Sequence, residues 1–284
     1  MTSLWKPKRL LLMLASLGAA GCATGPSQGP AQTHDNLDAV TWLQSSTEYA
    51  AVTSSLYASA AAALKEIASA GDPATMAVVL DIDETVLDNS PYQAQLIADN
   101  TVYDSATWDD WIEQGSATAV PGVVDFIRTS QALGVHVAFV TNRSCRPRAD
   151  TTDVCPQKEE TLENLEDVDI DTRETTLYIR RERPPEACMA DLSEEERAAG
   201  VWSSDKTSRR SCVERERRIV MLFGDQLGDF TAEPDDLDET SARELAGSYA
   251  GNWGKTWFML PNPTYGGWKP NSSGDKLSVL RKLD

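Results

Sequence analysis

A short apolar stretch that ends in two acidic residues constrains the fold of this chain most. Residues 78–86 have the sequence VVLDIDETV. Such a β-branched run without polar alternation is typical of a strand buried on both faces of a parallel sheet. Because side chains alternate along a strand, Asp81 and Asp83 should lie on the same side. Ligands of open α/β sheets bind at the carboxyl ends of strands, and two carboxylates there repel each other unless a cation or a shared proton intervenes. The stretch predicts a metal-assisted carboxylate nucleophile with a neighbouring general acid, and a strand followed by a merely acidic turn is the alternative.

The size and charge of the chain limit its partners. Its 284 residues suffice for one large domain or for a core with a small cap. The formal net charge of −18 argues against a nucleic acid polymer as partner, since binding many phosphates needs a basic surface. Small phosphorylated substrates remain possible if a metal ion and a few cationic side chains gather in one cleft.

The N-terminal residues have the organisation of a secretory signal. Three basic residues within the first nine precede the apolar range 10–17, and the small residues 18–21 lead directly into Cys22. The apolar range is too short for a transmembrane helix. A cysteine at this place resembles a bacterial lipobox, which implies cleavage after residue 21 and lipidation of the Cys22 thiol, although Ala19 stands where leucine is usual. Ordinary signal-peptidase cleavage, leaving a free cysteine, is the alternative.

The rest of the chain is predicted to be a tether followed by one domain. Residues 23–33 are rich in Gly, Pro, Ser and Gln, as flexible linkers are. We therefore assign 1–21 to a signal peptide, 22–35 to a flexible tether and 36–284 to the folded domain.

Predicted strands and helices alternate along this domain. Strand patterns occur at 78–83, 135–140, 175–179, 219–223 and 255–260, and helical patterns at 51–70, 121–133 and after Lys206. This alternation predicts an α/β fold with a Rossmann-like parallel sheet. The polar and aromatic range 88–119 lacks a clear period. With the N-terminal helices at about 36–70, it is expected to form a small, mostly helical cap.

Polar residues follow the predicted strands at several places. Thr141 and Asn142 end the second strand, Asp225 and Asp229 follow the fourth, and Lys206 begins a helix. The carboxyl ends of parallel strands meet at one edge, so these groups should converge with the acids of the first strand. The set suits phosphoryl transfer, in which a carboxylate attacks phosphorus and Mg²⁺ neutralises charge. A hydroxyl and a lysine then hold the phosphoryl oxygens while a second acid moves protons.

Four cysteines follow Cys22 in the sequence. They are Cys145, Cys155, Cys188 and Cys212. An even number in an oxidising compartment suggests disulfides. Their spacing fits no compact zinc pattern and no histidine stands near them, but four cysteines allow three connectivities.

The polar motifs resemble those of the haloacid dehalogenase superfamily. The four matches are residues 81–86 (DIDETV), 141–143 (TNR), Lys206 and 224–229 (GDQLGD). More narrowly, the chain is similar to class C acid phosphatases of the bacterial lipoprotein e type, which are membrane-anchored 5'-nucleotidases. Further matches lie at 42–49, 83–90, 108–111 and 260–266. With the lipobox, the resemblance covers nearly the whole chain.

The resemblance implies separate tasks for the acids. Asp81 would be the nucleophile and a magnesium ligand. Asp83 would be the general acid and base, with its backbone carbonyl on the metal ion. Asp225 would be a direct ligand, and Asp229 a direct or water-mediated one.

The resemblance also implies how substrate is held. The second motif and Lys206 would hold the phosphoryl group. Trp108 and Tyr265 are candidates for stacking on a nucleobase, an interaction worth roughly 1–3 kcal/mol per base, with core packing as the alternative. Arg209 and Arg210 are expected to pair with nearby acids rather than to contact substrate.

Two stretches, 144–156 and 181–204, look like insertions relative to the family pattern, and each contains or borders cysteines. Pairing Cys145 with Cys155 would staple the first insertion. Pairing Cys188 with Cys212 would staple the second onto the helix after Lys206. The insertions lie beside catalytic strand ends, so the substrate range is expected to differ from that of relatives.

The resemblance implies a Mg²⁺-dependent phosphomonoesterase, an acid phosphatase or 5'-nucleotidase, that forms an aspartyl-phosphate from nucleoside monophosphates. The lipobox implies a lipid anchor at Cys22 in the bacterial cell envelope, expected at the outer membrane, with the catalytic domain outside the cytoplasm. Two alternatives stay open: a broad-specificity phosphotransferase, and a non-catalytic surface lipoprotein that binds a planar ligand such as haem. The intact acidic motifs weigh against the second, because an inactive scaffold has little reason to keep a cluster of like charges.

Overall fold

The computed structural model describes residues 34–232 and 237–269. The predicted signal peptide, the lipidation site Cys22 and the tether up to residue 33 lie outside the described residues. Within the described part of the chain, no helix has the length and apolarity needed to cross a membrane.

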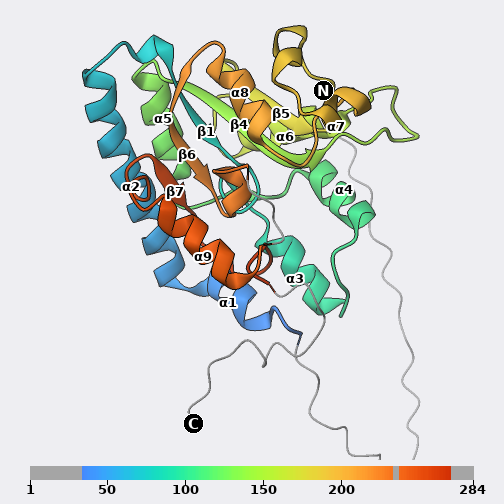
Figure 1. The fold of residues 1–284 in the computed structure, drawn as a ribbon. Coiled ribbons are helices and arrows are strands. Elements are labelled where there is room, and N and C mark those ends of the chain that lie inside the picture. The colour runs from blue at the N-terminus through green and yellow to red at the C-terminus, as the bar shows by residue number, and fades with distance from the viewer. Residues whose placement is uncertain (1–33, 233–236, 270–284) are drawn as a thin grey trace, which may run out of the picture. The chain divides into compact units, whose positions relative to one another are not determined.

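Five parallel strands form the central sheet, which confirms the predicted Rossmann-like architecture (Figure 1). In spatial order they are β5 (Thr175–Arg180), β4 (His136–Ser144), β1 (Met76–Leu80), β6 (Arg218–Gly224) and β7 (Trp257–Met259). Strand β1 is central, pairs in parallel with β4 and β6, and is buried at every residue. Because the strands run in one direction, their carboxyl ends meet at one edge of the sheet.

Helices precede, connect and follow these strands. They are α1 (Leu37–Ser45), α2 (Thr47–Ser69), α3 (Ser90–Ala98), α4 (Ser105–Gln114), α5 (Val123–Ala132), α6 (Pro156–Asp167), α7 (Glu194–Ala199), α8 (Thr207–Glu214) and α9 (Glu239–Ser248). Short 3₁₀ turns are η1 (Pro73–Thr75), η2 (Glu186–Asp191) and η3 (Leu227–Asp229).

The alternation of side chains in β1 divides the packing between two cores. Val78 and Leu80 belong to a large apolar cluster that includes α2 and α5. Ala77 and Val79 belong to a second cluster, which includes Val213 of α8. A strand covered on both faces needs an apolar residue at every position, which explains why β1 shows no polar alternation.

Helix α2 packs against the sheet layer and reaches the turn after β1. Its buried residues recur every three or four positions. One of them, Tyr57, stacks on Phe223 of β6 with ring centroids 5.6 Å apart, and its hydroxyl donates a hydrogen bond to the carbonyl of Thr85 at 2.8 Å. At Gly122 (φ +94°) a Cβ would lie 2.8 Å from the α2 backbone, so glycine is required for the close approach of α2 and α5. The part of the range 36–70 that forms α2 thus supports the acidic turn from the sheet side.

The segment after β1 leaves the sheet and returns through a short antiparallel ladder. Strand β2 (Leu87–Asp88) pairs with β3 (Thr118–Ala119), and α3 and α4 lie between them in the chain. Helix α3 contacts α1, and α4 contacts α6 (Figure 1). The range 88–119 is therefore a mostly helical excursion that begins next to the acidic motif, as expected of a cap.

The two disulfides join the cysteines in the expected pairs, Cys145 with Cys155 and Cys188 with Cys212. The first closes the loop between β4 and α6, and the second ties the range 181–204 to α8. Although this range is polar in sequence, it has a small core of its own, in which Trp202 is completely buried beside the second disulfide. Both insertions are thus held against the sheet edge where β4 and β5 end.

Candidate active site

Residues predicted for catalysis gather at the carboxyl edge of the sheet. Asp81 directly follows β1, and Asp225 directly follows β6. One carboxylate oxygen each of Asp81, Asp225 and Asp229 lies within 4.8 Å of the others, and all three residues are buried. Gly224 makes this approach possible, because a Cβ there would lie 2.2 Å from the Cβ of Asp229. We call these three aspartates the acid cluster.

A lysine and an asparagine hold the acid cluster. The Nζ of Lys206 lies 2.6 Å from Oδ1 of Asp81 and 2.5 Å from Oδ1 of Asp229. The amide of Asn262, in the loop after β7, donates a hydrogen bond of 2.8 Å to Oδ2 of Asp225. Asn262 lies in the range 260–266, which resembles the class C acid phosphatases, but the sequence alone did not predict a role for it. Its position just after the last strand was the signal that could have found it.

The charges of this cluster are unbalanced. Burial raises the pKa of Asp81 to about 7, against the opposing charge of Lys206 and with the help of Asp229 and Asp83. Burial, followed by the charges of Asp229 and Asp81, raises the pKa of Asp225 well above its usual range. Oδ1 of Asp81 is buried against the ammonium group of Lys206, which also contacts Asp229. Three carboxylates facing one ammonium group could therefore hold a divalent metal ion, and oxygen donors suit a hard cation.

Asp83 lies outside the acid cluster and has different partners. Arg143 donates to its Oδ1 from Nε at 3.0 Å and from a terminal nitrogen at 2.8 Å. Asn89 donates to the same oxygen at 3.0 Å, and Trp111 of α4 fixes Asn89 with a hydrogen bond of 2.8 Å. The two acids of the first motif are thus separated, one turned to the acid cluster and the other to the cap. Arg143 belongs to the second motif in the sequence, but its hydrogen bonds to Asp83 were not predicted.

Thr141 and Asn142 lie near the end of β4, as predicted. The hydroxyl of Thr141 accepts a hydrogen bond from the backbone N–H of Arg143 at 3.0 Å, and the residue is completely buried. Asn142 is exposed, and its Oδ1 accepts a hydrogen bond of 2.8 Å from Arg209. Arg209 thereby fixes the orientation of the Asn142 amide.

Arg209 and Arg210 form no ion pair with an acid in the described part of the chain, which corrects the expectation from sequence that they pair with nearby acids. Among the described residues, Arg209 donates to the carbonyls of Thr141 and of residues 203–205. Arg210 donates to the carbonyls of residues 228 and 229. Both arginines are buried, and a guanidinium group with five N–H donors can satisfy several carbonyls of irregular loops at once. They shape the loops that carry the second and fourth motifs.

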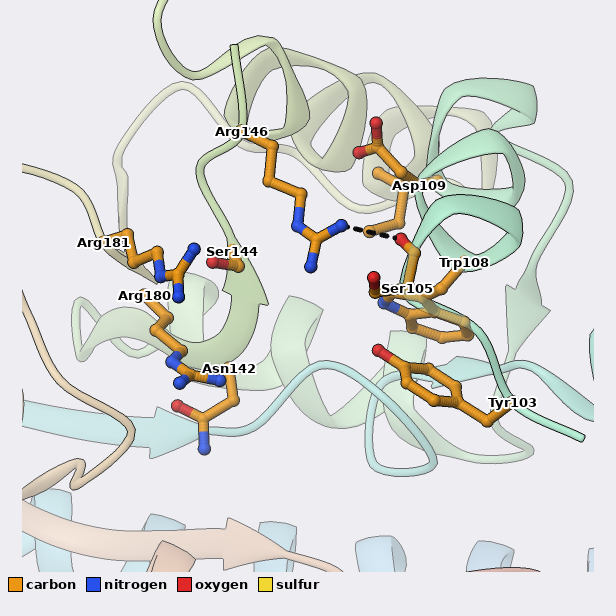
Figure 2. Close-up of a pocket in the computed structure, with 10 residues that line it drawn as sticks. Tyr103, Ser105, Trp108, Asp109, Asn142, Ser144, Arg146, Arg180 and Arg181 are labelled. Carbon is orange, nitrogen blue, oxygen red and sulfur yellow. Dashed lines mark hydrogen bonds between the residues drawn. The ribbon is translucent and has the colours of Figure 1, made fainter. Parts of the chain in front are cut away.

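The two aromatic candidates have different surroundings. Trp108 of α4 is half-buried, packs edge-on against Tyr92 with centroids 5.1 Å apart, and has the guanidinium carbon of Arg143 5.9 Å from its ring centroid. It lines a pocket together with Asn142 (Figure 2). Tyr265, in the loop after β7, is half-buried and does not line this pocket. A stacking task for either ring stays a prediction.

In this parallel sheet, one aspartate directly follows the central strand and two more follow a neighbouring strand, with a lysine beside them. This arrangement defines the haloacid dehalogenase-like class. The chain belongs to the HAD superfamily, subfamily IIIB (acid phosphatase), whose family model matches residues 15–268. This subfamily is a class of phosphoric monoester hydrolases.

Individual relatives agree with this membership. Acid phosphatase 1 of Solanum lycopersicum is 26% identical over 195 residues, which are 69% of this chain and 60% of that protein. The stem 28 kDa glycoprotein of Glycine max is 25% identical over 187 residues, 66% of this chain and 58% of that protein. The chain thus spans about 60% of the length of these curated relatives.

Solved structures show the same fold. The class C acid phosphatase of Bacillus anthracis, solved both with tungstate bound and in a second structure, matches with a TM-score of 0.69 and 26% identity. The match covers 88% of this chain and 98% of that one.

Proposed function

We propose that this protein is a Mg²⁺-dependent phosphomonoesterase that hydrolyses nucleoside monophosphates, or similar small phosphomonoesters, outside the cytoplasm. The observation that carries the proposal is the acid cluster with Lys206 among its carboxylates. It combines a nucleophile, metal donors and a cation in one buried place. The Bacillus anthracis relative supports the ligand class, because tungstate is an oxyanion with the shape of phosphate.

Asp81 supplies the nucleophile of this mechanism. One of its carboxylate oxygens attacks phosphorus while the bond to the leaving oxygen breaks, which gives an aspartyl-phosphate. Lys206, 2.6 Å from Asp81, is close enough to hold a phosphoryl oxygen during the attack. Thr141 and Asn142 donate to the other phosphoryl oxygens from the end of β4.

Asp83 moves the protons. Its side chain is 15% exposed, which leaves it within reach of a substrate. Protonated, it gives its proton to the leaving oxygen, and as a carboxylate it then takes a proton from the water that attacks the phosphoenzyme. Arg143 and Asn89 both bind its Oδ1, so the other carboxylate oxygen is left for these transfers.

Asp81, Asp225 and Asp229 would hold the metal ion, with the backbone carbonyl of Asp83 as a further ligand. We propose Mg²⁺ because the side-chain donors are carboxylate oxygens. When bound, the ion neutralises the charges of nucleophile and phosphate together. Asn262 keeps Asp225 in the orientation that ligation needs.

The nucleotide part of the proposal rests on aromatic side chains. Trp108 and Asn142 line opposite walls of one pocket, so a planar base can stack near the phosphoryl group. Tyr265 is a second stacking candidate. The location rests on the lipobox-like sequence at Cys22, which would anchor the domain to the bacterial envelope, at the outer membrane.

Phosphate release from adenosine 5'-monophosphate and from an aryl phosphate tests the function. We expect turnover with Mg²⁺, loss of turnover with a chelator, and a fall of at least about 10³-fold in kcat for Asp81→Asn. Asp125→Asn is the matched control, because this acid is exposed on α5 and far in sequence from every motif. Hydrolysis by Asp81→Asn at the wild-type rate would show that the mechanism is wrong. Phosphorylated alcohols formed with added acceptors would identify a phosphotransferase, and a wild type without turnover would favour a binding protein.

A further inference from the structure

A pocket that shares Asn142 with the proposed active site contains three arginines that the proposed mechanism does not use. Arg146, Arg180 and Arg181 line it together with Asn142 and Trp108. Its volume is about 90 Å³, smaller than the sites that enclose a whole small molecule, so it suits one charged group of a larger ligand. Figure 2 shows Arg180, Arg181 and Asn142 on one wall, Trp108 on the opposite wall, and the guanidinium group of Arg146 between them.

The positive charges of this pocket are not neutralised by neighbours. Among the described residues, no carboxylate lies within ion-pair distance of Arg146, Arg180 or Arg181, and the side chain of Arg146 donates only to the carbonyl of Ser105, at 3.1 Å. The acidic residue in the lining, Asp109, is bound by Arg148 with hydrogen bonds of 2.8 and 3.0 Å. In a chain of net charge −18, an uncompensated basic pocket is a local exception. Grouping like charges costs free energy, and an anionic ligand bound between the three arginines would offset this cost.

The backbone holds these arginines firmly. The N–H of Cys145 donates to the carbonyl of Arg180 at 2.8 Å, and the N–H of Arg181 donates to the carbonyl of the buried Trp202 at 3.0 Å. Arg181 has a φ of +63°, a left-handed backbone conformation that residues other than glycine rarely adopt. Such strain persists where the surroundings impose it, and it gathers at binding sites. Both disulfide-tied insertions contribute to the pocket, the first through Arg146 and the second through Arg181.

Two further residues connect the pocket to a ligand. Asn142, which the proposed mechanism places on the transferred phosphoryl group, is also part of the pocket wall. The hydroxyl of Ser144, two residues on, is buried in the same lining without a hydrogen-bond partner among the described residues. A molecule whose phosphoryl group is held by Asn142 therefore also faces this pocket.

We propose that this pocket is a subsite for a second phosphate on the substrate, so that the enzyme prefers phosphomonoesters with two phosphate groups over those with one. The inference rests on the proposed function, since it assumes that the scissile phosphate binds at the acid cluster. Guanidinium groups bind phosphate through paired, charge-assisted hydrogen bonds, and three of them suit a dianion. Trp108 provides a flat surface on the wall opposite Arg180 and Arg181.

Adenosine 3',5'-bisphosphate and adenosine 5'-monophosphate are the probes, because they differ only in the second phosphate. We expect kcat/KM for the bisphosphate to exceed that for the monophosphate by about tenfold or more, and Arg180→Gln or Arg181→Gln to lower this ratio by about tenfold, the effect of one hydrogen bond to a charged group. Arg173→Gln is the matched control, because Arg173 is 83% exposed and, within the described residues, pairs with the nearby Asp171 alone. Its ratio should equal that of the wild type.

Titration calorimetry on Asp81→Asn separates this inference from the function on which it rests. The inactive variant should bind the bisphosphate at least about tenfold more tightly than the monophosphate, and adding Arg181→Gln should remove most of the difference. Equal affinities, together with normal monophosphate turnover by the wild type, would overturn the subsite and leave the function intact. Tighter bisphosphate binding by a protein without phosphatase activity would overturn the function and leave the subsite.

Discussion

Replacing Asp81, the proposed nucleophile, should stabilise the metal-free protein at alkaline pH. The change is Asp81→Asn, which keeps the size of the side chain and removes its charge. The pKa of Asp81 is about 7 in the fold against a usual value of 3.8, so the native protein holds this proton more tightly than the unfolded chain does. The stability that protonation contributes is therefore complete at low pH and is lost as the pH rises from about 4 to about 7.

The magnitude follows from the two pKa values. Their difference corresponds to about 4 kcal/mol of free energy of unfolding. The wild type loses this stability between low pH and pH 8, whereas the Asn variant has no charge at this position and keeps it. At pH 4 the two proteins should differ by less than about 1 kcal/mol from this cause.

Urea denaturation in the presence of a chelator, at pH 4 and pH 8, measures this effect. The Asn variant should unfold at a higher midpoint than the wild type at pH 8, although it has lost activity. Adding Mg²⁺ should narrow the gap, because an ion at 100 times its Kd stabilises the wild type by about 2.7 kcal/mol and the variant by less. A variant that is less stable than the wild type at pH 8 without metal would refute the charge argument.

Three other changes test the surroundings of the site. Arg143→Met removes two hydrogen bonds from Asp83 and should lower kcat by about 10–100-fold with little change in KM. Arg143→Lys should recover part of the loss. An unchanged kcat in Arg143→Met would mean that the function of Asp83 does not depend on Arg143. Asn262→Ala frees Asp225 and should weaken metal binding by about 10–100-fold, read from the Mg²⁺ dependence of both activity and thermal stability. Replacing Cys188 and Cys212 together by serine opens a loop of 24 residues and should cost about 3 kcal/mol in urea denaturation at unchanged pH, against no loss if the thiols are free in the wild type.

Strand positions and the acidic motif could be predicted because their signals are local. Each apolar run ends where the chain leaves the buried sheet, so the change to polar residues marks the strand end in the sequence itself. Asp81 and Asp225 follow two such runs, and parallel order then brings both to one edge. Lys206 was grouped with these acids from its position at the start of a predicted helix, and the family resemblance then added its task of holding the phosphoryl group.

Partners of buried charges could not be predicted in this way. Arg143 and Asp83 are 60 residues apart in the chain, and Asn262 and Asp225 are 37 apart. Arg209 was expected to pair with an acid, but it donates hydrogen bonds to backbone carbonyls of the loop before α8 instead. Which acceptor a guanidinium group reaches depends on how loops close around it, and that is a property of the packed chain.

The sequence by itself therefore determined the order of strands and helices, the acids at the strand ends and the family, because periodicity and short motifs are written in consecutive residues. Only the tertiary structure separated Asp81 from Asp83 by their partners and brought Arg146, which is in one insertion, beside Arg180 and Arg181 at the start of the other. Electrostatic interactions act through space over a few ångströms, so the charge of a pocket depends on which distant segments the fold brings together.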